Sequence, residues 1–430
     1  MIDYNGIEKS FNVLYPEIEN ATYLSQVNYS DELKRPYQRW YRYKEGFSVE
    51  LVKRLIKEQA KRSTGTILDP FSGSGSTLIG ANELGYKGLG FEVNPFSYFL
   101  SKVKLENYTL GEITLFKSLF EQVLNEENGI FPMPNLSFAD KVFNKEVQDK
   151  LMSIKKNIID LENEGINPNV VNLLKLGWLS SIEELSNYRK AGNGLKKRKL
   201  KNPIVLNKED VYYKLDHIYS NMYTDLETKK GTRNIQLINH TCIDMDKFIE
   251  DSSVTGVIFS PPYANCFDYT EIYKLELWFG GFVANYEEMR TLKKSSLRSH
   301  LNANFKEDID NVYTIPLLED ILSKLKEKKL WDKKIPIMLK LYFHDMFRVI
   351  EKCYSALEPG GFCTIVVSNS SYGGIVVPTD LLFSIFAEKI GFEVSRIEVA
   401  RYIITSSQQY NITKEQKNFL RESVICLKKN

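Results

Sequence analysis

Short apolar runs alternate with amphipathic patterns along parts of this chain, and the alternation predicts a sheet flanked by helices. In residues 66–107 an apolar strand, a glycine-rich turn, a helix, a second strand and a second helix follow one another. This order is typical of the first half of a doubly wound α/β sheet. The predicted strands are residues 66–70, 87–93, 235–245, 256–263, 362–370, 392–403 and 423–429, the last two forming a terminal hairpin. The sequence therefore predicts a seven-stranded doubly wound sheet.

Two long segments break this alternation. Residues 108–234 carry amphipathic helical patterns, such as 145–163 and 170–187, and residues 281–335 are polar and rich in lysine. Residues 1–39 show no clean periodicity and are predicted to form a mostly irregular lead-in. The remaining segments are assigned to one core: residues 40–107, 235–280 and 336–430. About half of the chain is thus predicted to be core, and half to be largely helical insertions.

Composition narrows the class of protein. Of the 430 residues, 43% are hydrophobic and 26% are charged, which is typical of a soluble globular protein. No run approaches the roughly 18 apolar residues that a membrane span needs, so no membrane partner is expected. The five cysteines form no C-x-x-C pair, which argues against a disulfide framework or a zinc ribbon and favours a cytoplasmic location without a bound metal. The net charge of +2 does not by itself indicate a polyanionic partner.

The turn after the first predicted strand has the composition of a ligand-binding loop. Residues 69–75 read DPFSGSG, and Gly73 and Gly75 would let the backbone approach a ligand closely at the start of a helix. The loop lacks both the GKS or GKT of a phosphate-binding NTPase loop and the spacing of a dinucleotide fingerprint. Asp69, directly before the glycines, would repel a pyrophosphate but attract an ammonium or sulfonium group.

Two further acids follow later strands. Glu92 ends the second strand, where a carboxylate accepts the ribose hydroxyls in this fold, and Asp244 follows the third, where it could accept from an adenine amino group. Three acids at three strand ends suit a nucleoside without phosphates, and S-adenosylmethionine is the natural ligand of that kind. The alternative is that each acid only caps a helix. Their order along the chain favours the cofactor site.

A Ser-Pro-Pro-Tyr turn, residues 260–263, follows the apolar strand at 256–259. Because Pro261 and Pro262 have no N–H, the turn offers carbonyl groups without competing donors, and the Ser260 hydroxyl adds an acceptor. Such a corner fits an exocyclic amino group of a base, with its lone pair directed at an electrophile, and Tyr263 could stack on that base. The alternative is that this segment is only a turn that ends a strand, with a tyrosine in the core. A predicted nucleoside site on the same sheet makes this alternative less favoured.

DPFSGSG and SPPY together resemble motifs I and IV of the DNA amino-methyltransferases, which methylate N4 of cytosine or N6 of adenine. The resemblance covers the predicted core and implies a Rossmann-like methyltransferase sheet that binds S-adenosylmethionine. It implies that Glu92 holds the ribose and Asp244 the adenine, and EGFS at 45–48 resembles motif X, near the cofactor carboxylate. The expected cofactor-binding residues are Phe47, Ser48, Asp69, Pro70, Phe71, Gly73, Gly75, Glu92, Asn94 and Asp244, and those expected at the target amino group are Ser260, Pro261, Pro262 and Tyr263.

The implied reaction is in-line transfer of methyl from sulfonium to nitrogen, without a covalent intermediate. None of the fourteen prolines precedes a cysteine, as the Pro-Cys pair of cytosine-C5 enzymes would require. Serine before Pro-Pro-Tyr is more typical of N4-cytosine enzymes, whereas aspartate or asparagine is commoner among adenine enzymes, so N4 of cytosine is the expected target. N6 of adenine, the guanine amine of tRNA and a protein glutamine stay open as alternatives, as does a DNA-binding subunit without catalysis.

A basic stretch in the first insertion predicts contact with double-stranded DNA. Residues 189–201 hold seven lysines or arginines around Gly-Asn-Gly, and such a flexible loop could grip phosphates. The predicted contacts are Arg189, Lys190, Lys196, Lys197, Arg198 and Lys199; the alternative is a solvated charged face. Residues 290–298 are a weaker second case, Asp268 and Tyr269 are expected at the pocket rim, and residues 405–411 are expected to touch substrate.

Residues 108–234 are favoured as the segment that reads the target sequence, and residues 281–335 stay open as a second segment that could contact DNA. The family resemblance implies host protection, in which a cognate restriction endonuclease could act separately.

Overall fold

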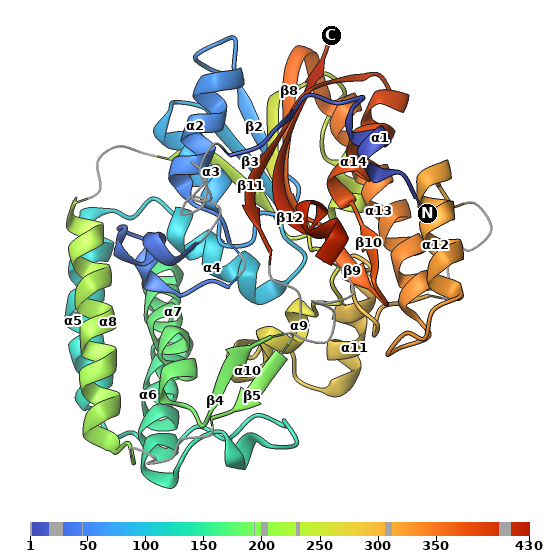
Figure 1. The fold of residues 1–430 in the computed structure, drawn as a ribbon. Helices are drawn as coiled ribbons and strands as arrows, with labels where there is room; N and C mark the ends of the chain where they lie inside the picture. Colours follow the sequence, from blue (N-terminus) through green and yellow to red (C-terminus); the bar gives the residue numbers. More distant parts are fainter. Residues whose placement is uncertain are drawn as a thin grey trace.

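A central mixed sheet organises the structure (Figure 1). The computed structural model describes residues 2–16, 29–44, 46–192, 194–198, 205–228, 233–305, 312–403 and 414–430. The sheet has eight strands in the order β1–β11–β12–β8–β7–β2–β3–β6. Their bounds are Val13–Leu14 (β1), Thr66–Asp69 (β2), Lys87–Phe91 (β3), Ile235–Ile238 (β6), Val254–Phe259 (β7), Leu357–Ser368 (β8), Phe392–Tyr402 (β11) and Arg421–Lys429 (β12).

All seven predicted strands are confirmed, and their pairing gives a doubly wound α/β sheet. Strands β8, β7, β2, β3 and β6 run parallel, while β12 runs antiparallel to both β8 and β11 as the predicted terminal hairpin. The eighth strand, β1, corrects the prediction of an irregular lead-in, because Val13 pairs with Ile397 of β11. A strand of two residues is too short to show a period-two pattern, so the sequence carried no signal for it.

Helices cover both faces of the sheet, and alternate strand residues point to opposite faces. Leu68 and Val257 pack with α13 (Ile335–Ala356) and α14 (Thr379–Lys389), whereas Ile67 and Ile258 pack with α2 (Val49–Gln59). Every residue of β7 is buried, as expected for a central strand with helices on both sides. The strand order reverses between β2 and β7, and open α/β sheets bind ligands at that point.

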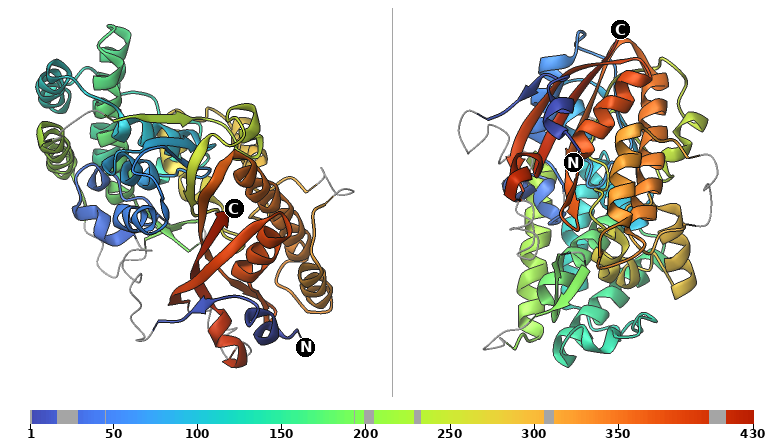
Figure 2. Two further views of the ribbon diagram at one scale, coloured as in Figure 1. Left: turned by 90° about the horizontal axis from the view of Figure 1, so that it is seen from above. Right: turned by 45° about the vertical axis from the view of Figure 1, so that its right-hand side comes forward.

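The first insertion is a helical bundle with one hairpin. The helices are α5 (Leu110–Asn125), α6 (Lys145–Asn163), α7 (Pro168–Leu185) and α8 (Lys208–Thr228). Seen from above, they stand on one flank of the molecule, with α12 and α13 on the other (Figure 2). The basic stretch forms an antiparallel hairpin of β4 (Tyr188–Ala191) and β5 (Gly194–Lys197), which corrects the prediction of a flexible loop. Gly192, with a φ of +57°, supplies the left-handed backbone that a tight hairpin turn requires.

The remaining elements are short or lie in the second insertion. They are α1 (Tyr4–Glu8), α3 (Ser76–Glu83), α4 (Pro95–Leu105), α9 (Tyr269–Ile272), α10 (Lys274–Phe279), α11 (Tyr286–Ser295), α12 (Pro316–Lys326), the hairpin β9 (Ser370–Tyr372) and β10 (Ile375–Val377), and five 3-10 turns: Tyr29–Lys34, Gln38–Trp40, Ala139–Lys141, Cys242–Lys247 (η4) and Lys414–Phe419. Within the described residues, the helices are too short or too polar to cross a membrane.

A buried ion pair ties the last strand to α14 and should contribute strongly to stability. The side chains of Arg421 and Asp380 are both fully buried, and Arg421 Nε lies 2.8 Å from Asp380 Oδ2. Asp380→Ala should lower the free energy of unfolding by about 3–5 kcal/mol, because it leaves a buried guanidinium without its main partner. Denaturation by guanidinium chloride, followed by circular dichroism, measures the loss.

The matched control is Glu50→Gln, which breaks an ion pair with Arg35 whose glutamate side chain is 53% exposed. Its cost should stay below about 1 kcal/mol. Equal losses in the two variants would contradict the assignment of a special structural role to Asp380.

Candidate active site

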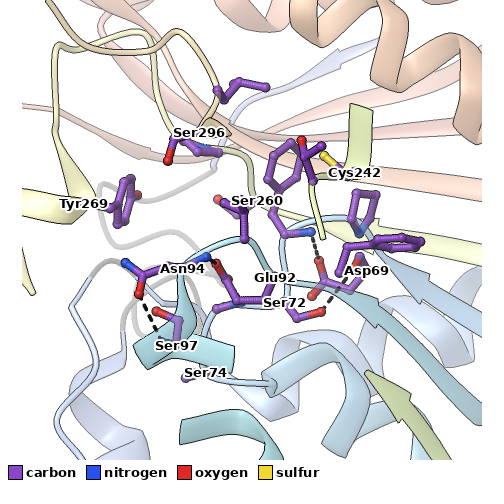
Figure 3. A pocket seen from close by; sticks show the side chains of 18 of the residues that line it. Asp69, Ser72, Ser74, Glu92, Asn94, Ser97, Cys242, Ser260, Tyr269 and Ser296 are labelled. Atoms are coloured by element: carbon purple, nitrogen blue, oxygen red, sulfur yellow. Dashed lines mark hydrogen bonds between the residues drawn. The ribbon is translucent and has the colours of Figure 1, made fainter. Parts of the chain in front are cut away.

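A cavity opens at the carboxyl ends of β2, β3 and β7, where the strand order reverses. It encloses about 1040 Å³ of space, including its mouth. Figure 3 shows Asp69, Glu92 and Ser260, from the ends of three strands, around this space. The lining also includes Tyr43, Gly46, Phe47, Pro70, Phe71, Ser72, Gly73, Asn94, Ser97, His240, Thr241, Cys242, Pro262, Asp268, Tyr269, Ser296 and His300.

The glycine loop between β2 and α3 forms the floor of this cavity. Gly73 and Gly75 have φ values of +48° and +83°, which side chains rarely tolerate, so the turn requires glycine at both positions. Helix α4 holds the loop from below, because Ser101 Oγ donates to the Gly73 carbonyl and Lys104 Nζ to the Ser74 carbonyl, both at 2.6 Å. Lys104 is fully buried, and burial lowers its pKa to about 7. The loop backbone is therefore fixed before any ligand arrives.

Two acids at the strand ends keep acceptor capacity for a ligand. Asp69 Oδ1 accepts from the Phe71 N–H at 2.9 Å. Glu92 accepts from the N–H groups of Gly73 and Asn94, one on each oxygen, both at 2.8 Å. Each of these oxygens retains a further lone pair. Burial raises the pKa of Asp69 to about 7 and that of Glu92 to about 7, against the opposing effect of these hydrogen bonds.

The Ser-Pro-Pro-Tyr turn lies between this cavity and a second one. Ser260 lines both, Pro262 lines the first, and Tyr263 lines the second. The second cavity encloses about 1710 Å³ and brings together cationic and acidic side chains: Arg42, Lys44, Arg189, Lys190, Arg198, Arg401, Glu183, Glu184 and Glu422. Tyr43, Gly46 and Phe47 line both cavities. A group placed beside Ser260 is therefore within reach of both spaces.

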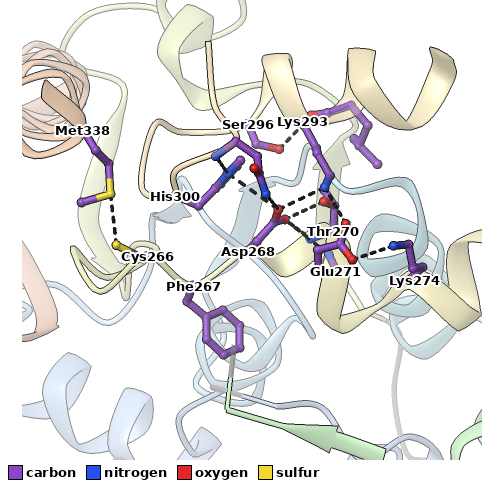
Figure 4. Close-up of polar contacts among 12 residues, drawn as sticks. Cys266, Phe267, Asp268, Thr270, Glu271, Lys274, Lys293, Ser296, His300 and Met338 are labelled. Atoms are coloured by element: carbon purple, nitrogen blue, oxygen red, sulfur yellow. Dashed lines mark hydrogen bonds and ion pairs between the residues drawn. The ribbon is translucent and has the colours of Figure 1, made fainter. Parts of the chain in front are cut away.

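The segment after this turn is fixed by a polar cluster (Figure 4). Asp268 caps α9 by accepting from the Thr270 N–H at 3.0 Å, and Lys293 Nζ of the second insertion lies 3.3 Å from its other oxygen. His300 of the same insertion lies 3.7 Å from Asp268. Asp268 and Tyr269 line the cavity, in agreement with their expected place at its rim, while Ser296 and His300 were missed, because nothing in their polar segment distinguishes them from a surface loop.

Comparison with known proteins decides the family. Residues 9–102 match the DNA methylase family model for N6 and N4 enzymes. The chain is 30% identical to the type II methyltransferase M.AvaI of Nostoc sp. over 432 residues, which cover 94% of this chain and 88% of the relative. It is also 27% identical to the type II methyltransferase M.BsoBI of Geobacillus stearothermophilus, over 98% of this chain and 91% of that one. The chain belongs to the DNA amino-methyltransferases.

The methyltransferase uses S-adenosylmethionine as its methyl donor, and the first cavity fits this molecule. Glu92 presents two acceptor oxygens of the kind that a ribose diol needs, and Asp69 offers a carboxylate for a cationic group. An added Cβ on Gly73 would lie 3.1 Å from Tyr43 Oη, a contact tighter than side chains normally make, and the φ of +48° disfavours a side chain there as well. Of the expected cofactor residues, Phe47, Asp69, Pro70, Phe71, Gly73, Glu92 and Asn94 line the cavity. Their individual roles stay predictions.

Three expected cofactor residues and one expected target residue line neither of the two cavities. Asp244 lies in η4, where it pairs with Lys247 at 3.2 Å, and it does not line the cofactor cavity. After β6, the residues that line this cavity are His240, Thr241 and Cys242. The two others stabilise helix starts: Ser48 caps α2 by accepting from the Leu51 N–H, and Gly75 is the N-cap residue of α3. Pro261, within the Ser-Pro-Pro-Tyr turn, is buried.

Some of the predicted DNA-contacting side chains are exposed, and others are engaged in contacts within the protein. Arg189, Lys196 and Lys197 are exposed on the β4–β5 hairpin. The structure corrects the prediction that Lys190 contacts DNA, since its side chain is 4% exposed and its Nζ lies 2.6 Å from Glu276. Arg198 donates to the carbonyls of Ser186, Tyr188 and Glu183, so it holds the hairpin base. Lys199 and residues 405–411 lie outside the described residues, and among the described ones no group of three or more histidine, cysteine or acidic residues could hold a metal.

The raised pKa values predict that cofactor affinity depends on pH. Below about pH 7 Asp69 and Glu92 are largely protonated, and above it they become carboxylates that attract a cation and accept hydroxyl hydrogens. Affinity for S-adenosylmethionine should therefore rise between pH 6 and pH 8, by about tenfold for each group whose charged form is required. Calorimetric titration at several pH values measures this dependence.

Asp69→Asn should make the pH dependence shallower, because one of the two titrating groups is then absent. Asp244→Asn is the control and should leave the slope intact, since Asp244 does not line the cavity. Equal affinity for the unchanged methyltransferase at pH 6 and pH 8 would refute a role for these carboxyl groups.

Proposed function

We propose that this methyltransferase transfers a methyl group to N4 of a cytosine that is flipped out of double-stranded DNA. The observation that carries the proposal is the position of Ser260, in the wall shared by the cofactor cavity and the second cavity. A base that enters through the second cavity would bring its exocyclic amine to Ser260, beside the bound methyl donor. Taking the base out of the helix is required, because the amine is otherwise engaged in base pairing.

The chain's own residues supply alignment and acceptors. S-adenosylmethionine supplies an electrophilic methyl group when bound. Ser260 and the carbonyls of the Ser-Pro-Pro-Tyr turn accept the amine hydrogens, which draws the nitrogen lone pair out of conjugation with the ring and aims it at the methyl carbon. The serine at position 260 favours cytosine as the target through the family resemblance, and N6 of adenine is the alternative.

The first insertion and its hairpin are proposed to bind and read the DNA. The hairpin borders the second cavity through Arg189, and Lys196 and Lys197 extend its exposed positive charge. Such charges would hold phosphates close to the opening through which the base must pass. The helical bundle of residues 108–234 is proposed to supply base contacts. Because the relatives are named type II methyltransferases, we also propose that a separate restriction endonuclease recognises the same sequence.

The proposed reaction is tested by the nature of the methylated product. Labelled methyl groups should enter duplex DNA rather than tRNA or protein, and digestion to nucleosides should yield N4-methylcytosine. N6-methyladenine would replace the cytosine assignment, and label in tRNA alone would refute the proposal. Ser260→Ala should lower the transfer rate by about a hundredfold or more, while calorimetric affinity for S-adenosylmethionine stays within about twofold.

The role of the hairpin is tested by the salt dependence of DNA binding. Replacing both Lys196 and Lys197 by alanine should weaken binding and reduce the slope of log K against log salt concentration by roughly 0.9 for each lost phosphate contact. Arg62→Ala is the control, since Arg62 pairs with Glu358 at the amino end of β8, whereas the cavities lie at the carboxyl ends of the parallel strands. An unchanged slope in the lysine variant would remove the hairpin from the DNA interface.

A further inference from the structure

We propose that Glu422 is the terminal acceptor of the proton released by methylation, which reaches it through Ser260 and Tyr263. This inference rests on the proposed function and extends it to a residue on β12, 159 positions away from Tyr263 along the chain. The three side chains form a continuous hydrogen-bonded row from the wall of the cofactor cavity to the second cavity.

The direction of each hydrogen bond is set by the chemistry at the far end of the row. Ionised Glu422 can only accept, so the Tyr263 hydroxyl donates to its Oε1 atom. The Tyr263 oxygen is then free to accept, and Ser260 Oγ donates to it at 3.3 Å. Because the Ser260 hydroxyl hydrogen is used in the hydrogen bond to Tyr263, the Ser260 oxygen presents only lone pairs to the target amine. Glu422 thereby fixes Ser260 as an acceptor, which is the role that the transfer requires.

An ion pair fixes the position of the Glu422 carboxylate. Its side chain is 3% exposed, and its second oxygen accepts from Arg401 Nε on the neighbouring strand β11. This ion pair holds the Glu422 carboxylate in a fixed position beside the Tyr263 hydroxyl. Burial and the neighbouring Glu422 raise the pKa of Tyr263 well above its usual value. Tyr263 therefore passes a proton on rather than storing a negative charge.

The proton balance of the reaction requires such an acceptor. When the nitrogen lone pair forms a bond to the methyl carbon, the carbon–sulfur bond breaks with its electrons left on sulfur, and the nitrogen becomes cationic. It returns to neutrality by giving one proton to Ser260 Oγ, as Ser260 gives its own to Tyr263 and Tyr263 gives its own to Glu422. Since Glu422 and Arg401 line the second cavity, the proton can then leave to solvent as the product departs.

The test compares Glu422→Gln, Tyr263→Phe and the double variant in single-turnover methylation of duplex DNA with saturating S-adenosylmethionine. Glutamine keeps an acceptor oxygen for Tyr263 but is no base, and phenylalanine removes only the hydroxyl. Each single variant should slow methyl transfer by about a hundredfold. The double variant should be no slower than either single one, because both changes interrupt the same row. Losses that multiply would overturn the relay.

Two further measurements separate proton transfer from a merely structural role. Affinity for S-adenosylmethionine and for DNA should stay close to that of the unchanged protein in both single variants. The melting temperature should be unchanged in Tyr263→Phe and lower in Glu422→Gln, which loses its ion pair with Arg401. In Glu422→Ala, added formate should restore a large part of the rate, because it can enter the second cavity and act as the missing base. Absence of rescue together with lowered affinities would assign Glu422 a structural role and overturn the proposal.

The control is Glu398→Gln, which alters a carboxylate that pairs with Arg396 on β11 and does not line either cavity. Its rate should match that of the unchanged enzyme. An unchanged rate in Glu422→Gln, with methylation of DNA intact in the parent, would refute the relay alone. Failure of the parent to methylate an exocyclic amine in DNA would refute the proposed function, so the two failures are distinguishable.

Discussion

The reversal of strand order between β2 and β7 is the constraint on which the whole site depends. At this point the connections leave the sheet in opposite directions, so the ends of the two neighbouring strands are left uncovered and a cavity forms there. Asp69, Glu92 and Ser260 are far apart in sequence but each directly ends or follows a parallel strand. The sheet therefore brings two buried carboxyl groups and the Ser-Pro-Pro-Tyr turn, which we propose binds the target amine, to the wall of one cavity.

The acids of this site are held at an energetic cost that a ligand can offset. Their raised pKa values show that burial opposes the charged form more strongly than the local N–H groups favour it. Lys104 lies below the same loop, where its contact with the Ser74 carbonyl orders the backbone. A cationic cofactor bound beside these carboxyl groups would favour their ionised form by direct attraction. Binding of a cation beside these two groups would therefore offset part of the desolvation cost of their charged forms.

The core and its two motifs could be predicted because they depend on local sequence. An apolar strand followed by DPFSGSG or SPPY predicts a turn at the carboxyl end of a parallel strand. In the structure Asp69, Glu92 and Ser260 all line the cavity at these strand ends. Predictions that depended on long-range packing were less successful. The order of the acids along the chain predicts Asp244 at the cofactor, but the direction of η4 decides where Asp244 lies. The burial of Lys190 depends on Glu276, 86 positions away, and the contribution of His300 depends on how the second insertion folds over Asp268.

The buried contact between Lys190 and Glu276 also constrains how the proposed target-reading insertion, residues 108–234, can be exchanged. Lys190 belongs to the insertion that carries the exposed basic hairpin, whereas Glu276 lies on α10, shortly after the Ser-Pro-Pro-Tyr turn. Tyr41 joins the pair by donating to Glu276 at 2.8 Å and accepting from Lys190 at 2.6 Å. An insertion transplanted from a relative without the matching lysine would leave a buried carboxylate unpaired inside the catalytic core, at a cost of about 3–5 kcal/mol. Under the proposed role of this bundle in reading DNA, new sequence specificity is reached most readily by substitutions within it, and an exchange of the whole insertion succeeds only if residues from both sides of the contact are exchanged together.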